Sequence, residues 1–198
     1  MSKIFYYDLE TTGTRHWKNG IHQLSGAIVI DGVKKESFNF KVQPNPQAAI
    51  EDAALEIAGV SRETIMSYPP MGVVYEQVVK MLAKYVNKFT KTDKLHLAGF
   101  NNAPFDNQFF RAFFTQNAKT AKEAEYGNYF GSWFWSDTID VMCLASNYLR
   151  NERHKMENFK LKTVAAYLGI EVEEDKLHDA LYDIYLTQKI YEIVTQNS

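Results

Sequence analysis

Lys3-Ile4-Phe5-Tyr6-Tyr7-Asp8-Leu9-Glu10-Thr11-Thr12-Gly13 is the stretch on which the interpretation of this chain depends. Its first part, Lys3–Leu9, is rich in aromatic and β-branched side chains and predicts a β-strand. Successive side chains of a strand point to opposite faces, so Asp8 and Glu10 are expected side by side on one face. An acidic pair alone also fits a solvated strand end, because about one such pair is expected by chance in a chain of this length.

The order of the other expected elements predicts an α/β fold. A second strand at His22–Ile30 and a third at Glu36–Val42 are joined by Asp31-Gly32, a two-residue hairpin signal. Beyond this hairpin, short strands alternate with helices, which predicts a mixed sheet with parallel strands next to the hairpin, flanked by helices. The later strands are expected at 95–98 and 133–135, and the later helices at about 104–113, 139–149, 161–168 and 179–195.

The composition limits the class of protein. The chain has 198 residues, the size of one domain, and we expect a single domain over residues 1–198. Its formal net charge is −2, which argues against a protein that coats nucleic acid by bulk positive charge. The chain has one cysteine, no apolar run long enough to cross a membrane and no signal-peptide pattern. These features predict a soluble cytoplasmic protein.

Two further acids lie where apolar residues are expected. Asp106 falls in the first turn of a helix and borders an aromatic face, although Asp is also common there because it interacts favourably with the helix dipole. Asp183 falls on the apolar stripe of the last helix, where a carboxylate is costly unless it is paired or bound to a metal. His178 is expected just before that helix, with Asp179 as its N-cap.

The four acids, Asp8, Glu10, Asp106 and Asp183, each lie at the end of an element next to the core. Four carboxylates at one site repel one another unless hard divalent cations such as Mg²⁺ or Mn²⁺ bind there. Such a site is typical of two-metal phosphoryl transfer. His178 is then the candidate general base, since the pKa of histidine lies near neutral pH.

Three motifs of this chain resemble those of the DEDDh 3′–5′ exonucleases, the family that includes the proofreading subunit of bacterial DNA polymerase III. Four residues separate the histidine from the last acid, as in the "h" subgroup, and the resemblance extends over nearly the whole chain. In order, the motifs are Tyr7-Asp8-Leu9-Glu10-Thr11-Thr12-Gly13, Asn102-Ala103-Pro104-Phe105-Asp106 and His178-Asp179-Ala180-Leu181-Tyr182-Asp183.

The resemblance implies a ribonuclease H-like fold and a catalytic site. It implies that Asp8, Glu10, Asp106 and Asp183 hold two Mg²⁺ or Mn²⁺ ions and that His178 deprotonates the attacking water. It further implies release of 5′-mononucleotides from the 3′ end of single-stranded or frayed nucleic acid. The residues that it places against the terminal nucleotide are Thr11, Thr12, Gly13, Asn102 and Phe105.

The substrate and partners stay open at this stage. DNA is favoured over RNA because the first motif most resembles proofreading exonucleases, and RNA trimming is the alternative. A catalytically idle module that binds nucleic acid or docks on a DNA polymerase is the second alternative, although all five motif residues are present. The chain departs from many family members at Thr14, Gln23 and Asn101, which bears on substrate preference.

Other features have two interpretations each. The aromatic segment 126–135 is either a platform for stacking bases or a buried strand with its flanks, and we favour burial. The basic stretch 150–155 is either solvated or a phosphate contact. The helical spacing of apolar residues from Val74 to Phe89 predicts a core-facing stripe, and Cys143 is expected as a small core residue.

Overall fold

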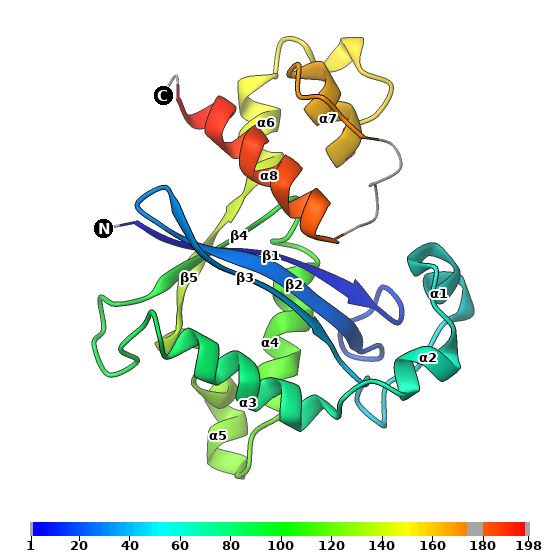
Figure 1. Ribbon diagram of the computed structural model, residues 1–198, viewed down its shortest axis with the longest axis vertical. Helices are drawn as coiled ribbons and strands as arrows, with labels where there is room; N and C mark the ends of the chain where they lie inside the picture. Colours follow the sequence, from blue (N-terminus) through cyan, green and yellow to red (C-terminus); the bar gives the residue numbers. More distant parts are fainter. Residues whose placement is uncertain (1, 174–179, 197–198) are drawn as a thin grey trace.

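The computed structural model describes residues 2–173 and 180–196 (Figure 1). Within these residues the chain forms a five-stranded sheet of order β3-β2-β1-β4-β5. Strand β2 is antiparallel to both β1 and β3, whereas β4 is parallel to β1 and β5 is parallel to β4. The mixed sheet expected from the element order is therefore confirmed. The strands are β1 (Lys3–Thr11), β2 (Ile21–Ile30), β3 (Val33–Lys41), β4 (Leu95–Gly99) and β5 (Phe134–Asp140).

Helices cover both faces of this sheet, as Figure 1 shows. Helices α3, α4 and α5 lie on one side of the sheet and α6, α7 and α8 on the other, while α1 and α2 lie beyond the carboxyl end of β1. The α-helices are α1 (Asp52–Ala58), α2 (Arg62–Met66), α3 (Met71–Leu82), α4 (Asp106–Gln116), α5 (Ala121–Glu125), α6 (Val141–Tyr148), α7 (Leu161–Tyr167) and α8 (Ala180–Thr195). Two short 3₁₀ helices are η1 (Gly127–Ser132) and η2 (Arg153–Lys155).

The turn between β2 and β3 follows from its two residues. Asp31 has φ 49° and Gly32 has φ 77°. Two central residues with positive φ are what a type I′ turn requires, and this turn matches the twist of the strands that it joins. The hairpin fixes the register in which β2 lies against β3.

The sheet buries a different set of side chains on each face. Against α3 and α4, an aromatic core forms around Phe5, Phe110 and Phe134, which are at most 1% exposed. Against α8, a smaller apolar cluster contains Ile4, Tyr6, Ala98 and Ile184. The alternation along β1 therefore assigns Asp8 and Glu10 to the face that α8 covers.

Several expectations about single elements were wrong. Helix α3 ends at Leu82, so Phe89 lies beyond it and is 86% exposed. Helix α4 begins at Asp106, two residues after Pro104, and continues to Gln116. Cys143 is exposed because it lies on the outer side of α6, whose buried residues are Val141 and Ala145.

The segment 126–135 combines a 3₁₀ helix with the start of β5. Phe130, Trp133 and Phe134 are buried there, as favoured, whereas Tyr126 and Tyr129 are exposed. Strand β5 continues to Asp140, well past the expected end at residue 135. In the described residues, no helix combines the length and the apolar character that a membrane span needs.

Candidate active site

The end of β1 places two acids on the face that α8 covers. In the register with β2, Asp8 pairs with Ser25 and Glu10 pairs with Gln23. The register shifts between Glu10 and Thr11, so the regular pairing is interrupted directly after the second acid, and Thr11 then pairs with Ile21. An irregularity of this kind bends the strand and changes the direction of the chain that follows it. It starts the loop that surrounds the site.

The connection from β4 to α4 places the third acid. Asp106 is the first residue of α4 and is 6% exposed. Its Oδ1 accepts a hydrogen bond from the backbone N–H of Leu9, with an N···O distance of 3.3 Å. This bond joins the carboxyl end of β1 directly to the start of α4. The third acid thus lies beside the first two.

Helix α8 contributes the fourth acid. Asp183 lies in the first turn of α8 and is half-buried, and the next residue, Ile184, packs on Ile4 and Tyr6 of the sheet. That packing positions the start of α8 over the acidic end of β1. His178 and Asp179, which were predicted as general base and N-cap, lie outside the described residues.

The electrostatics of Asp8 show that the four acids are neighbours. Burial raises the pKa of the Asp8 carboxyl well above its usual value, and the negative charges of Asp106, Glu10 and Asp183 raise it further. Among the described residues, the hydrogen bond from the backbone of Leu9 acts in the opposite direction. The structure therefore brings all four predicted acids together.

The pKa of Asp106 is also raised. Burial is the main cause that raises its pKa to about 7, with smaller contributions from the charges of Glu10 and Asp140. Backbone hydrogen bonds, among them that of Leu9, act in the opposite direction. A carboxyl group with such a pKa is half-protonated near neutral pH when no cation is nearby.

Such a set of oxygen donors fits a hard divalent cation. Mutual repulsion and burial both disfavour the charged carboxylates, and a bound cation reverses both effects. Residues 2–173 and 180–196 contain no group of three or more Asp, Glu, His or Cys side chains already closed around one point as metal ligands. Within these residues the four acids are neighbours but do not form a closed set of metal ligands.

The loop after β1 is held by its own side chains. Thr12 is fully buried, and its hydroxyl donates to the carbonyl of Ala49 over 2.7 Å. Asn19 is buried and donates to Ala49 and to Thr12. A Cβ on Gly13 would overlap the Asn19 side chain, so only glycine fits there. Of the predicted nucleotide contacts, Thr11 is half-buried and lies next to Glu10.

The two remaining predicted contacts lie in the loop before α4. Asn102 is fully buried, and its Nδ2 donates to the Thr138 hydroxyl over 3.0 Å. Its buried Oδ1 has no hydrogen-bond partner among the described residues. Phe105 is half-buried directly before Asp106, and its ring centre lies 5.1 Å from that of Phe109. Of these two side chains, only Phe105 retains exposed surface.

Asp140 is a residue that the motifs missed. Its carboxylate accepts from the backbone N–H groups of Asn101 and Ala103 at 3.1 and 3.2 Å. It also caps α6 through the N–H groups of Met142 and Cys143. An acid directly before an apolar helix is an N-cap signal, and this signal could have pointed to Asp140. Through the loop before α4, it supports the position of Asp106.

The comparison with family models agrees with this geometry. The sequence model of the RNase T exonuclease family matches residues 5–191, which include all four acids. The chain belongs to this exonuclease family. No curated protein matches it.

Solved structures of exonuclease I share its fold. A zinc-bound complex of the Escherichia coli enzyme with single-stranded DNA superposes with a TM-score of 0.75 and 20% identity, over 100% of this chain and 41% of the other. The same enzyme with a dT13 oligonucleotide gives 0.73 and 20%, over 98% and 41%. A product-bound exonuclease I gives 0.71 and 18%, over 99% and 44%. This chain thus spans about two-fifths of the length of the proteins that it matches. The likeness confirms the ribonuclease H-like fold expected for this exonuclease family.

Proposed function

We propose that this protein is a 3′–5′ exonuclease that releases 5′-mononucleotides from the 3′ end of single-stranded or frayed DNA. The observation that carries the proposal is the position of Asp8, where burial and three neighbouring carboxylates raise the pKa together. A protein keeps such a cluster at a cost in stability, which is typical of a functional site. Membership of an exonuclease family supports the same reaction.

The four acids are the proposed ligands of two divalent cations, Mg²⁺ or Mn²⁺. When bound, these ions supply a water of lowered pKa and neutralise the charge that develops on the phosphate and the leaving oxygen. The carboxylates of Asp8, Glu10, Asp106 and Asp183 provide the hard oxygen donors that these ions prefer. Metal-bound and metal-free forms of exonuclease I are consistent with a metal-dependent site on this fold.

The chain's own residues set the geometry of the reaction. The N–H of Leu9 holds one oxygen of Asp106, which leaves the other oxygen to bind a cation. Asp140 fixes the loop before α4 through Asn101 and Ala103. We propose that His178 takes the proton from the attacking water, since a histidine near its ordinary pKa can act as a base at neutral pH.

The 3′-terminal nucleotide is proposed to lie against Thr11–Gly13 and the ring of Phe105. Gly13 leaves room for the Asn19 side chain, which holds this loop in place. Trp17 is 75% exposed in the same loop and lies near the basic residues Arg15 and Lys18, which suits an incoming single strand. DNA is the proposed polymer because the structural relatives are complexes with single-stranded DNA.

The decisive test uses 5′-end-labelled single-stranded DNA and RNA with Mg²⁺, Mn²⁺ or EDTA. We expect a ladder of 3′-shortened DNA products with either metal, slower shortening of RNA and no products in EDTA. If RNA were shortened faster than DNA, the preferred substrate would be RNA and the proposed preference for DNA would be wrong. Binding of both polymers without any shortening would make the protein an idle binding or polymerase-docking module.

Variants of the acids and of His178 sharpen this test. Asp183→Asn removes a proposed metal ligand and should abolish shortening. His178→Ala should lower the rate by about 10²–10⁴-fold, the usual contribution of a positioned base. A His178→Ala rate within about tenfold of the wild type would remove His178 from the proposed role.

A further inference from the structure

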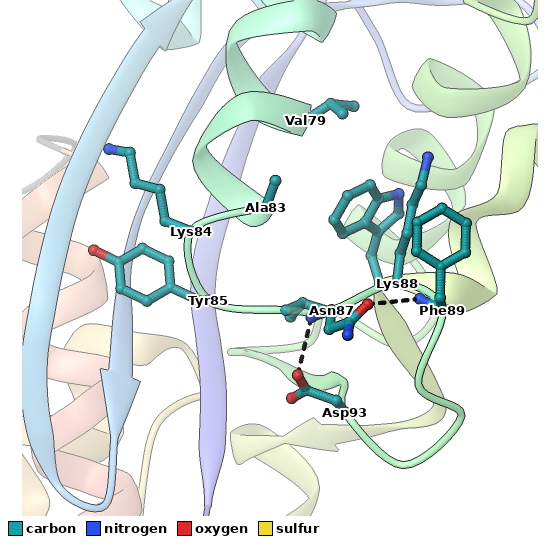
Figure 2. Close-up of a pocket in the computed structure, with 10 residues that line it drawn as sticks. Val79, Ala83, Lys84, Tyr85, Asn87, Lys88, Phe89 and Asp93 are labelled. Carbon is teal, nitrogen blue, oxygen red and sulfur yellow. Dashed lines mark hydrogen bonds between the residues drawn. The ribbon is translucent and has the colours of Figure 1, made fainter.

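An open pocket, whose lining residues Figure 2 shows, lies near the start of β1, because its lining residue Asp93 forms an ion pair with Lys3. It has a volume of about 530 Å³ and is lined by the end of α3, the loop before β4 and Trp133. The ammonium group of Lys88 lies 5.3 Å from the ring centre of Phe89 and 5.7 Å from that of Trp133. Phe89 is 86% exposed, so a large apolar ring beside a cation faces solvent. No step of the proposed reaction uses this pocket.

A second pocket of about 440 Å³ repeats the same combination. The ammonium group of Lys94 lies 5.2 Å from the ring centre of Trp135. The ring of His96 stacks on Trp135, with centres 5.9 Å apart and an interplanar angle of 29°. Asp93 lines both pockets, which makes them neighbours. We name Lys88, Phe89, Lys94, His96 and Trp135 the distal strip.

The charge of this region is positive. Residues 84–96 contain four lysines, and Asp93 is their only acid. Asp93 is bound by Lys3 of β1, while Lys84 is held by Glu36 of β3. Within residues 2–173 and 180–196, neither Lys88 nor Lys94 forms an ion pair. In the distal strip, Lys88 and Lys94 therefore lie beside aromatic faces without an acidic partner among the described residues, whereas His96 lies 3.9 Å from Asp137.

We propose that the distal strip binds single-stranded nucleic acid, as a second contact for the 5′ part of a strand whose 3′ end lies at the carboxylates. Bases stack on aromatic side chains without sequence preference, and lysines contact the phosphates between them. A polyanion also complements cations that lack an acidic partner. The role as a second contact rests on the proposed exonuclease function.

The distance between the two sites sets a length requirement. Lys3, which holds Asp93, and Asp8 lie five residues apart on β1, or about 17 Å along the strand. A dinucleotide is too short to reach both sites, whereas a strand of about 25 nucleotides is long enough. The distal strip should therefore strengthen binding of long strands only.

The test measures binding of a labelled oligo-dT of about 25 nucleotides by fluorescence anisotropy in EDTA, which prevents cleavage. We expect Phe89→Ala to raise the dissociation constant by about tenfold, the loss typical of one stacked base. The pair Lys88→Glu and Lys94→Glu should also reduce the salt dependence, by about 0.7 in slope per lost phosphate contact. Lys122→Glu, an exposed lysine on α5 that lines neither pocket, should change little.

Cleavage kinetics separate this proposal from the exonuclease proposal. With a dinucleotide, KM and kcat of Phe89→Ala should equal those of the wild type, whereas KM rises for the long strand. Long-strand binding within about twofold of the wild type in all strip variants would overturn the distal strip. The proposal would also be overturned if Phe89→Ala changed the oligomeric state of the protein and left its affinity for the long strand unchanged. A wild type that binds through the strip but never cleaves would instead reject the exonuclease proposal alone.

Discussion

Asp8 is the acid of this site whose ionised form is opposed by all three of the other acids. Asp8 is half-buried, and its desolvation and the charges of Glu10, Asp106 and Asp183 all act against ionisation of its carboxyl group. Among the described residues, the influences on its pKa are burial, these three charges and the backbone hydrogen bond of Leu9. Divalent cations bound to these carboxylates would offset this repulsion.

This residue-level view predicts how the stability of the metal-free protein depends on pH. Asp106 has a pKa of about 7 in the folded protein, against 3.8 without the fold. The folded state therefore holds a proton that the unfolded chain has lost, so the free energy of unfolding falls as the pH rises from about 4 to about 7. Urea denaturation in EDTA at several pH values measures this fall.

The matched variant is Asp106→Asn, which keeps an oxygen for the N–H of Leu9 but cannot ionise. It should unfold with a free energy about 1–3 kcal/mol higher than the wild type at pH 8 in EDTA, because one repelling buried charge is gone. Saturating Mg²⁺ should stabilise the wild type at that pH and have little effect on the variant. A variant less stable than the wild type in EDTA would contradict the proposed repulsion.

At the scale of single elements, the connection from β4 to α4 depends on β5. Asp140, the last residue of β5, accepts four backbone N–H groups, two from the loop before α4 and two from α6. It is 7% exposed. One carboxylate therefore fixes both the start of α6 and the loop that carries Asp106.

Replacing this carboxylate should loosen both elements. We expect Asp140→Ala to lower the free energy of unfolding by about 2–4 kcal/mol, from a lost N-cap and from buried N–H groups left without acceptors. The affinity for Mn²⁺ should fall as well. Asp137→Ala, on the exposed side of β5, is the control and should change stability by less than about 0.5 kcal/mol. Equal stability of both variants would remove Asp140 from this role.

The elements that sequence alone predicts well each contain one strong local sequence pattern. The alternation of β1 was enough to place Asp8 and Glu10 on one face, and Asp31-Gly32 was enough to place the hairpin. The predicted length of β5 is too short, because Ser136, Asp137 and Thr138 interrupt the apolar pattern from which the strand is predicted. In the sheet, β5 is an edge strand whose neighbour is β4. Local sequence does not reveal such pairing.

The end of α3 was misjudged for a similar reason. The apolar spacing continues to Phe89, but Asp93 accepts from the N–H of Asn87 and binds Lys3 of β1. The first contact closes the loop before β4 and the second ties this loop to the distant start of β1, so the chain turns toward β4 after Leu82. The exposure of Phe89, and with it the distal strip, could be found only in the three-dimensional structure.

At the scale of the whole molecule, the acids gather where the sheet changes direction. Strand β1 lies between antiparallel β2 and parallel β4, and its carboxyl end meets the starts of α4 and α8. Three segments far apart in the sequence thus bring acids to one point. With the formal net charge at −2, two divalent cations would change the balance to −2 + 4 = +2. The added positive charge would be concentrated where a phosphate is bound.

The most direct test of this account is a calorimetric titration of the wild-type protein with Mn²⁺, in parallel with Asp8→Asn. We predict binding of about two ions per chain at pH 8, and loss of at least one of them in the variant. Binding should release fewer protons at pH 8 than at pH 6, because Asp106 is already ionised at the higher pH. A wild type that binds no Mn²⁺, or an Asp8→Asn protein that binds it equally well, would contradict the central claim that these carboxylates form the metal site.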